Sequence, residues 1–167
     1  MNVRSFRVRP ATAGDSGAIR KLVYQTGINP TGLDWHRFTV AVSEAGEVVG
    51  CGQIKPHRDG SRELASIAVQ PPWRLQGVAR AVIEDLIGNA SQAVSLSGSA
   101  FPGLYLVCRE ELGAFYAKFG FRAIPEAEMP PHFKHITRLF RTLVKVSRIK
   151  EGLLVMHLEG GSGSIGG

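Results

Sequence analysis

The stretch that decides the fold is Glu63-Leu-Ala-Ser-Ile-Ala-Val69, followed by Gln70-Pro-Pro-Trp73 and Arg74-Leu-Gln-Gly-Val-Ala79. Its first part predicts a strand, and the residues Gly77–Ile87 predict a helix with one apolar stripe. The turn between them therefore presents several backbone N–H groups at the positive end of a helix dipole. A diphosphate group can bind at such a position.

The turn itself is suited to close approach by phosphates. Gly77 carries no side chain, Ala79 is small, and Arg74 adds a positive charge. The hexapeptide alone is a weak signal, and an ordinary strand–turn–helix is the alternative. Its place between a strong strand and a strong helix favours a binding site. We therefore predict that the site is formed by Arg74, Leu75, Gln76, Gly77, Val78 and Ala79.

Further strands and helices are predicted on both sides of this stretch. The predicted strands are Val3–Val8, Phe38–Ser43, Val48–Lys55, Leu104–Cys108, Phe121–Ile124 and Leu153–Leu158, and the later helices are Leu33–Arg37, Glu111–Phe119 and His132–Lys145. A first helix starts near Asp15, Asp59-Gly60 predicts a hairpin turn, and Ala90–Gly103 predicts a long Ser/Gly-rich connection. This order predicts an α/β fold: a mixed, mostly antiparallel central sheet of about seven strands, helices on both faces, and an extra helix between the last two strands.

Length and composition predict one globular domain. The chain has 167 residues, of which 44% are hydrophobic and 20% charged. We expect this domain to span residues 1–159 and a flexible Gly/Ser tail to span 160–167.

The charge and the cysteines narrow the class of protein. The net charge of +6 favours anionic partners but does not choose among a phosphorylated cofactor, nucleic acid and an acidic membrane. The two cysteines have no CxxC spacing, which argues against a disulfide framework. With no signal-peptide pattern and no apolar stretch of about 20 residues, we expect a cytoplasmic protein without a membrane partner.

Two motifs resemble a known family. Arg74-Leu-Gln-Gly-Val-Ala79 is similar to the R/Q-x-x-G-x-G/A signature of the GCN5-related N-acetyltransferases (GNAT), although Ala79 stands where many members have Gly. Glu63–Val69 looks like the family's fourth strand, and Leu112–Phe121 resembles its FYxKxGF segment. The resemblance covers Val3–Ile124 in element order. It implies an acyltransferase that moves an acetyl group from acetyl-CoA to a primary amine, by direct attack in a ternary complex and without a metal.

The resemblance also implies two catalytic residues. Glu63 lies fourteen residues before Gly77, where members of the GCN5 type carry a glutamate base. The alternative is a solvated charge at the edge of the hairpin. Tyr116, inside the FYxKxGF match, is implied as the acid that protonates the CoA thiolate. The alternative is a tyrosine that packs its ring in the core.

Main-chain groups of one strand are implied as cofactor partners. Ile67, Ala68 and Val69 would bind the thioester carbonyl and the pantetheine amides, as an added strand does. The alternative is full pairing of this strand with Leu104–Cys108.

The remaining reactive side chains give no metal or nucleophile signature. We predict that Cys51 and Cys108 pack in the core. His57, His132, His135 and His157 are scattered without ligand spacing, and we expect no metal site.

The acceptor is the least predictable part. The segment Tyr24–Arg37, the insertion that begins at Glu128, and Arg109 could line its site, with core packing or surface exposure as the alternatives. The Glu63-Leu-Ala run faintly resembles the acetyltransferase domain of N-acetylglutamate synthases. The acceptor is thus expected to be a small molecule or peptide amine, with an amino acid as one hypothesis.

A rival hypothesis from another class is a non-catalytic module. It would bind acyl-CoA as a sensor or use the basic helix His132–Lys145 to dock an acidic partner. Such a module needs neither Glu63 nor Tyr116. We expect the basic helix face to be solvated and not to bind nucleic acid, because no aromatic stacking platform accompanies it. The family resemblance leaves a homodimer open.

Overall fold

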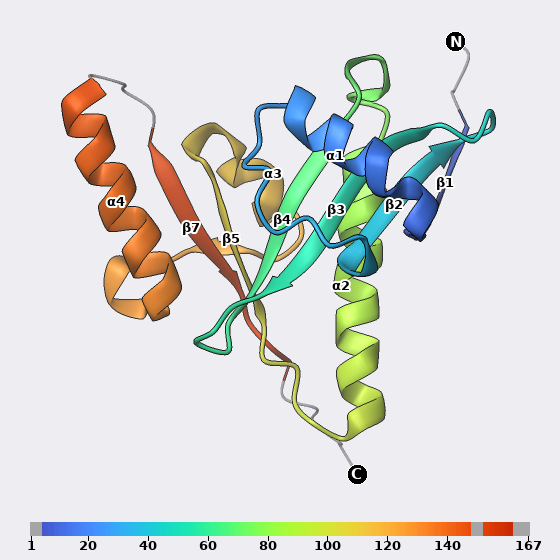
Figure 1. The fold of residues 1–167 in the computed structure, drawn as a ribbon. Helices are drawn as coiled ribbons and strands as arrows, with labels where there is room; N and C mark the ends of the chain where they lie inside the picture. Colours follow the sequence, from blue (N-terminus) through green and yellow to red (C-terminus); the bar gives the residue numbers. More distant parts are fainter. Residues whose placement is uncertain (1–4, 148–151, 162–167) are drawn as a thin grey trace. The chain divides into compact units, whose positions relative to one another are not determined.

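The computed structural model describes residues 5–147 and 152–161, and leaves out the side chains of 144–147 (Figure 1). The elements are β1 (Phe6–Pro10), α1 (Ser16–Gln25), β2 (Phe38–Ser43), β3 (Val48–Pro56), β4 (Arg62–Val69), α2 (Val78–Ser97), β5 (Leu104–Arg109), α3 (Gly113–Ala117), β6 (Arg122–Ala123), α4 (Pro131–Ser147) and β7 (Leu153–Leu158). The seven strands follow the order β1-β2-β3-β4-β5-β7-β6. Neighbours β1–β2, β2–β3, β5–β7 and β6–β7 are antiparallel, and β4–β5 is parallel. The predicted fold class is confirmed.

The chain divides into two compact units. The first consists of Met1–Lys55 and Leu64–Ser99, and the second of Pro56–Glu63 and Ala100–Gly167. Each unit therefore combines segments that are distant in the sequence. The turn between β3 and β4 belongs to the second unit, although most of both strands belongs to the first.

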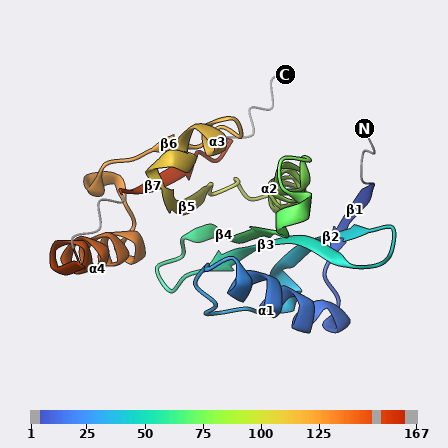
Figure 2. The same cartoon turned by 90° about the horizontal axis from the view of Figure 1, so that it is seen from above.

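The first unit packs two helices on opposite faces of β1–β4 (Figure 2). On the α1 side, Ile19, Leu22 and Val23 are buried in one apolar cluster with residues of β2 and β3. On the α2 side, Gly50 and Gly52 of β3 make room for the helix, because a Cβ atom at either position would collide with an apolar side chain. Close packing of α2 on the sheet therefore depends on these two glycines.

A partly buried ion pair fixes the start of α1. Arg9 Nη1 and Nη2 donate to the two carboxylate oxygens of Asp15 at 2.7 and 3.0 Å. The Thr12 amide and hydroxyl donate to the same carboxylate at 2.7 and 2.9 Å. The hydrogen bond from Arg9 is the main reason that the pKa of Asp15 falls to about 2, and the bonds from Thr12 lower it further.

The predicted connection Ala90–Gly103 is wrong for its first half, because α2 continues to Ser97 and ends at Gly98 with φ of 73°. Serines favour loops when their hydroxyls compete for backbone groups. Here the Ser91 hydroxyl donates to the Ile87 carbonyl at 2.9 Å, and the Ser95 hydroxyl to the Ser91 carbonyl at 3.1 Å. These bonds follow the helix and do not break it.

The second unit is built on β5, β7 and β6. Strand β5 pairs with β7 along its whole length, from Leu104 with Leu158 to Arg109 with Leu153. Its buried apolar cluster consists of Ile124, Met129, Phe133 and Val155, with Tyr105 and Val107 packed against it. Phe133 anchors the first turn of α4, since its side chain is fully buried.

The remaining predictions differ in detail. The hairpin turn is confirmed, since the His57 amide donates to the Ser61 carbonyl at 2.9 Å. The predicted helix at Leu33–Arg37 is a single 3₁₀ turn, Trp35–Arg37. The start of the predicted first strand and most of the predicted tail lie outside the described residues. Within the described part of the chain, no helix is both long and apolar enough to cross a membrane.

Candidate active site

The loop Arg74–Ala79 has an unusual backbone. Leu75 adopts φ of 59° although it is not a glycine, and Gly77 adopts φ of 82° as the residue that precedes α2. Left-handed residues in a turn are typical of the concave amide arrangements that bind anions. The Leu75 side chain is fully exposed, so it makes no contact that explains its strained backbone.

The amides at the start of α2 come before its first helical hydrogen bond. Those of Val78, Ala79 and Arg80 therefore have no acceptor within the helix, whereas residues 74–77 form a hydrogen-bonded turn. The first bond into the helix is from the Ala81 amide to the Gly77 carbonyl, at 3.0 Å. Because α2 is 20 residues long, its dipole adds a partial positive charge at this end.

Two side chains of the loop are held by hydrogen bonds to backbone carbonyls. Arg74 Nε donates to the Val69 carbonyl at 3.3 Å, and Gln76 Nε2 donates to the Pro72 carbonyl at 2.7 Å. Around Gly77 there is open space, because a Cβ atom there would have no heavy atom within 4 Å. Glycine is therefore required at this position for its positive φ and not for room within the protein.

Strand β4 is interrupted just before the predicted pantetheine contacts. Ser66 is buried and adopts φ of 57°, a left-handed conformation inside a strand. Its hydroxyl accepts from Gln53 Nε2 at 3.0 Å, and its carbonyl accepts from Cys51 Sγ at 3.8 Å. The irregularity directly precedes Ile67–Val69. The register pair between β4 and β5, Glu63 with Tyr105, lies at the other end of the strand and within the second unit.

Glu63 is a paired carboxylate and not the solvated charge that was the alternative. Its side chain is 15% exposed, and Glu63 Oε2 lies 2.7 Å from His57 Nε2. The His57 ring, in turn, stacks on the His132 ring with centroids 3.5 Å apart and meets the Phe133 ring edge-on. From the sequence alone, His57 is only one of four scattered histidines, and its pairing with Glu63 is not predicted. The signal was present, because His57 and Glu63 flank the predicted turn at its two sides.

Tyr116 lies on α3 and is partly buried. Burial raises its pKa to about 12, and Cys108 adds to the shift. Its ring contacts those of Phe115 and Phe121 at centroid distances of 5.1 and 6.3 Å. Among the described residues, the hydroxyl has no hydrogen-bond partner. The group is therefore protonated at neutral pH and able to donate.

The cysteines do not offer a nucleophile. Both are buried, and burial raises the pKa of the Cys51 thiol to about 12 and raises that of Cys108 as well. Cys108 Sγ lies 3.9 Å from Met156 Sδ. Core packing, as predicted, accounts for both residues.

The predicted site residues fall into two groups. The loop and Ile67–Val69 belong to the first unit, and Glu63 and Tyr116 belong to the second.

On the predicted acceptor side, the Lys55 ammonium donates to the Thr31 carbonyl at 3.2 Å and holds the segment before β2 in place. On α4, Arg138 and Arg141 both pair with Glu126, at 2.9 and 3.0 Å.

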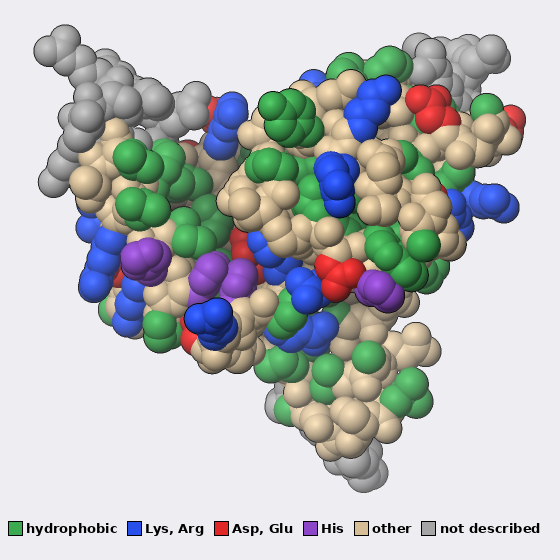
Figure 3. Space-filling model, in the orientation of Figure 1, with side chains coloured by type: hydrophobic (Ala, Val, Ile, Leu, Met, Phe, Trp, Pro, Cys, Tyr) green, Lys and Arg blue, Asp and Glu red, His purple; other side chains and the backbone are tan. Residues whose placement is uncertain are grey.

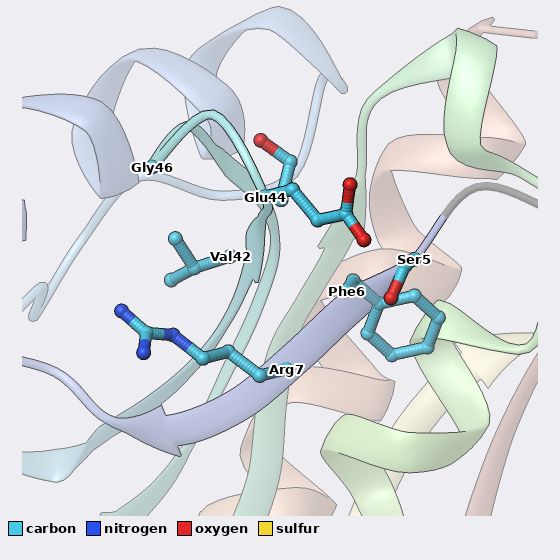
Figure 4. Close-up of a pocket in the computed structure, with 7 residues that line it drawn as sticks. Ser5, Phe6, Arg7, Val42, Glu44 and Gly46 are labelled. Atoms are coloured by element: carbon cyan, nitrogen blue, oxygen red, sulfur yellow. The ribbon is translucent and has the colours of Figure 1, made fainter.

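A surface pocket of about 340 Å³ lies elsewhere in the first unit (Figure 4). It is lined by Ser5, Phe6, Arg7, Val42, Ser43, Glu44 and Gly46. None of the predicted catalytic or cofactor-binding residues lines it. It is therefore not part of the candidate site.

Several proteins of known structure share this fold. Rv2747 from Mycobacterium tuberculosis, solved with CoA and NLQ, is 24% identical with a TM-score of 0.66, and the alignment covers 92% of this chain and 98% of that chain. The ribosomal-protein-S18-alanine N-acetyltransferase from Escherichia coli is 15% identical with a TM-score of 0.62, over 96% and 99% of the two chains.

A longer neighbour matches only in part. The N-acetylglutamate synthase from Neisseria gonorrhoeae, complexed with coenzyme A and N-acetyl-glutamate, is 20% identical with a TM-score of 0.62 over 93% of this chain. The alignment covers 35% of the synthase, so the chain spans about a third of that protein's length. The family model of the acetyltransferase (GNAT) domain matches residues 34–123, which is more than half of the chain. The protein therefore belongs to the GNAT family of acetyltransferases.

Proposed function

We propose that this N-acetyltransferase passes the acetyl group of acetyl-CoA to the primary amine of a small acceptor, by direct attack in a ternary complex. The observation that carries the proposal is the set of backbone amides at the start of α2, which precede the first helical hydrogen bond, from the Ala81 amide to the Gly77 carbonyl. They stand at the start of a 20-residue helix, where a diphosphate is stabilised by both the N–H groups and the dipole.

The cosubstrate would be held mainly by backbone groups. The loop Arg74–Ala79 would bind the diphosphate of CoA, with the guanidinium of Arg74 as an additional charge. The main chain of Ile67–Val69 would bind the pantetheine arm in the manner of an added strand. The left-handed Ser66 supports this role, because an irregular residue changes the direction of the strand immediately before these three residues.

Glu63 would act as the base. The attacking amine must lose a proton, and the Glu63 carboxylate would take it directly or through a water molecule. Its hydrogen bond to His57 at 2.7 Å holds the side chain in one orientation. A fixed, largely buried carboxylate is better suited to this task than a mobile one at the surface.

Tyr116 would act as the acid. As the amine nitrogen bonds to the acetyl carbon, the carbon–sulfur bond breaks and the CoA sulfur leaves with the electron pair. A proton from the Tyr116 hydroxyl would neutralise that thiolate. The hydroxyl is protonated at neutral pH, as a proton donor must be, although burial raises its pKa to about 12 and so makes it a weaker acid.

An amino-acid-like amine is the acceptor class that we propose to test first. The neighbours' names include a synthase complexed with N-acetyl-glutamate and an enzyme for the alanine of a ribosomal protein. Both products carry an acetylated α-amino group. The predicted acceptor segment Tyr24–Arg37 contains polar side chains such as Asn29 and the exposed Tyr24.

The test is an acceptor screen that follows thiol release from acetyl-CoA, with amino acids, short peptides and simple amines. Thermal unfolding with and without CoA is measured in parallel. We expect CoA to raise the unfolding midpoint and at least one α-amine to release thiol. Stabilisation by CoA without turnover on any amine would favour the rival acyl-CoA sensor, and the lack of any CoA effect would overturn both hypotheses.

A further inference from the structure

Three side chains with metal-ligand chemistry converge in the second unit. They are His57 from the β3–β4 turn, Glu63 from β4 and His132 from the first turn of α4. One ligand atom of each lies within 4.8 Å of the other two. Within this set, His57 Nε2 and Glu63 Oε2 are 2.7 Å apart. The cluster could not be predicted from a short ligand spacing, because His132 is far from the other two residues along the chain.

The cluster is held in place by a second layer of contacts. Asp59 Oδ2 accepts a hydrogen bond from the His132 amide at 2.9 Å, and Asp59 Oδ1 accepts one from the Ser61 amide at 2.9 Å. One carboxylate thus joins the turn to the start of α4. The neighbouring Phe133 is fully buried and fixes the same helical turn.

The partial burial of these side chains suits the binding of a metal ion, which loses some of its bound water when protein ligands replace it. The side chains of His57 and Glu63 are 9% and 15% exposed, so each is shielded but not sealed. Histidine side chains reach the surface over the β3–β4 turn and the start of α4 (Figure 3). An ion can therefore enter from solvent and then be coordinated in a partly desolvated site.

We propose that His57, Glu63 and His132 form a binding site for a transition-metal ion, with Zn²⁺ as the ion that best fits the donors. Two imidazole nitrogens and one carboxylate oxygen make up a known zinc ligand set that leaves a fourth position open. Zinc–ligand bonds of about 2.0–2.2 Å place tetrahedral ligand atoms roughly 3.3 Å apart. The widest separation, within 4.8 Å, must shorten by at most roughly 1.5 Å, and the 2.7 Å pair of His57 and Glu63 must open by about 0.6 Å to reach that spacing.

His132 is the ligand that moves. The rings of His57 and His132 are stacked with centroids 3.5 Å apart, and one nitrogen of each must face the same ion. Asp59 holds the His132 backbone, so His132 would reach the ion by a change of its side-chain rotamer. The ion takes the place between His57 and Glu63 that their hydrogen bond occupies, and any proton shared there leaves to solvent.

Occupancy of this site has a consequence for acetyl transfer, and this part rests on the proposed function. Acetyl transfer in the family uses acetyl-CoA and no metal. A zinc ion on the Glu63 carboxylate would take the lone pairs that accept the proton of the amine. Zinc is therefore an inhibitor here and not a cofactor.

The binding test uses Co²⁺ as a spectroscopic probe of the chelator-treated protein. We expect visible absorption bands of one bound Co²⁺ per chain, which Zn²⁺ removes because it binds such sites more tightly. His132→Phe keeps an aromatic ring against His57 but has no donor nitrogen, and we expect it to weaken binding by about 100-fold or more. His135→Ala, on the exposed face of the same helix, is the matched control and should bind like the unchanged chain.

Two outcomes overturn the metal site: no Co²⁺ bands in the unchanged chain, or equal affinity in His132→Phe. Zn²⁺ is then added to the acetyl-transfer assay. The unchanged chain should be inhibited and His132→Phe should resist. Bound Co²⁺ without inhibition by Zn²⁺ would leave the metal site standing and contradict Glu63 as the base. Inhibition tests the function, and the absorption bands test the site.

Discussion

The loop at residues 74–79 and the cluster around Glu63 present different groups to a ligand, backbone amides in the first and side chains in the second. The loop leads into backbone amides that precede the first hydrogen bond of α2, and its Arg74 and Gln76 side chains donate to nearby backbone carbonyls. The cluster offers side chains, and each is already engaged: Glu63 with His57, and His57 with the His132 ring. A backbone site tolerates almost any side chain apart from the glycine that sets its φ. A side-chain site fails when one member changes.

The largest effect should come from Glu63→Gln, which removes the base but keeps the shape and one hydrogen-bond acceptor. We expect kcat to fall by about 10²–10⁴-fold, the usual contribution of a positioned base. CoA affinity should stay unchanged, since the loop does not use this side chain. Turnover and CoA binding are measured on the same preparation, and a variant that turns over normally would exclude Glu63 as the base.

Tyr116→Phe should have the next largest effect. The thiolate of CoA is a fair leaving group, because thiols ionise near pH 8.5, so the acid is less critical than the base. We expect kcat to fall by up to about 10²-fold with little change in the KM of the acceptor. The change should narrow at high pH, where the departing thiolate no longer needs a proton. An unchanged kcat would remove the acid role.

Gly77→Val tests the backbone site. A β-branched residue at φ of 82° is strained by about 1–2 kcal/mol and would shift the amides, so we expect CoA to bind roughly 10-fold more weakly. Isothermal titration with CoA measures this. Gly46→Val is the matched control, because Gly46 also has φ of 82° and open space around its Cβ position. Equal loss of CoA affinity in both variants would show that the effect is general strain.

Acid should lower the free energy of unfolding of the first unit by protonating Asp15 and so weakening its ion pair with Arg9. The pKa of Asp15 in the folded chain is about 2, below its ordinary value of 3.8, so the Arg9 pair stabilises the fold fully above pH 4. That stabilisation, about 2 kcal/mol, is lost as the pH falls from about 4 towards 2. Asp15→Asn should lower the free energy of unfolding by a similar amount at pH 7, measured in urea, and should flatten its decline below pH 4. A steep decline that persists in the variant would assign the acid sensitivity elsewhere.

The two regions also differ in how far the sequence could predict them. The loop is contiguous, and a glycine after a strand and before a helix is a local signal, so its place and its left-handed Gly77 follow from short-range rules. The cluster is assembled by tertiary structure. Glu63 was predicted through its family position, but its partner His57 required the hairpin register, and His132 required the docking of α4 through Asp59 and Phe133. The predicted hairpin could have indicated the pairing of His57 with Glu63, but no spacing rule predicts that His132 joins them.

The same division holds for the fold. Strand Phe38–Ser43 was predicted to the residue, since apolar residues and clear turn signals bound it. The end of α2 was missed because serine residues favour loops on average, whereas here their hydroxyls follow the helix. The roles of Glu63, Tyr116 and the cofactor loop remain predictions.

Helix α2 is uneven along its length, and this affects how it should respond to a ligand. Its first half is anchored by the buried side chains of Val78, Val82, Ile83 and Leu86, whereas Ala90 is the last residue buried against the protein. Amide hydrogen exchange should therefore be slow in the first half and fast over the final turns. CoA, held at the first turn, should slow exchange there and leave the serine-rich end as it was, so the helix should behave as two segments with separate opening equilibria.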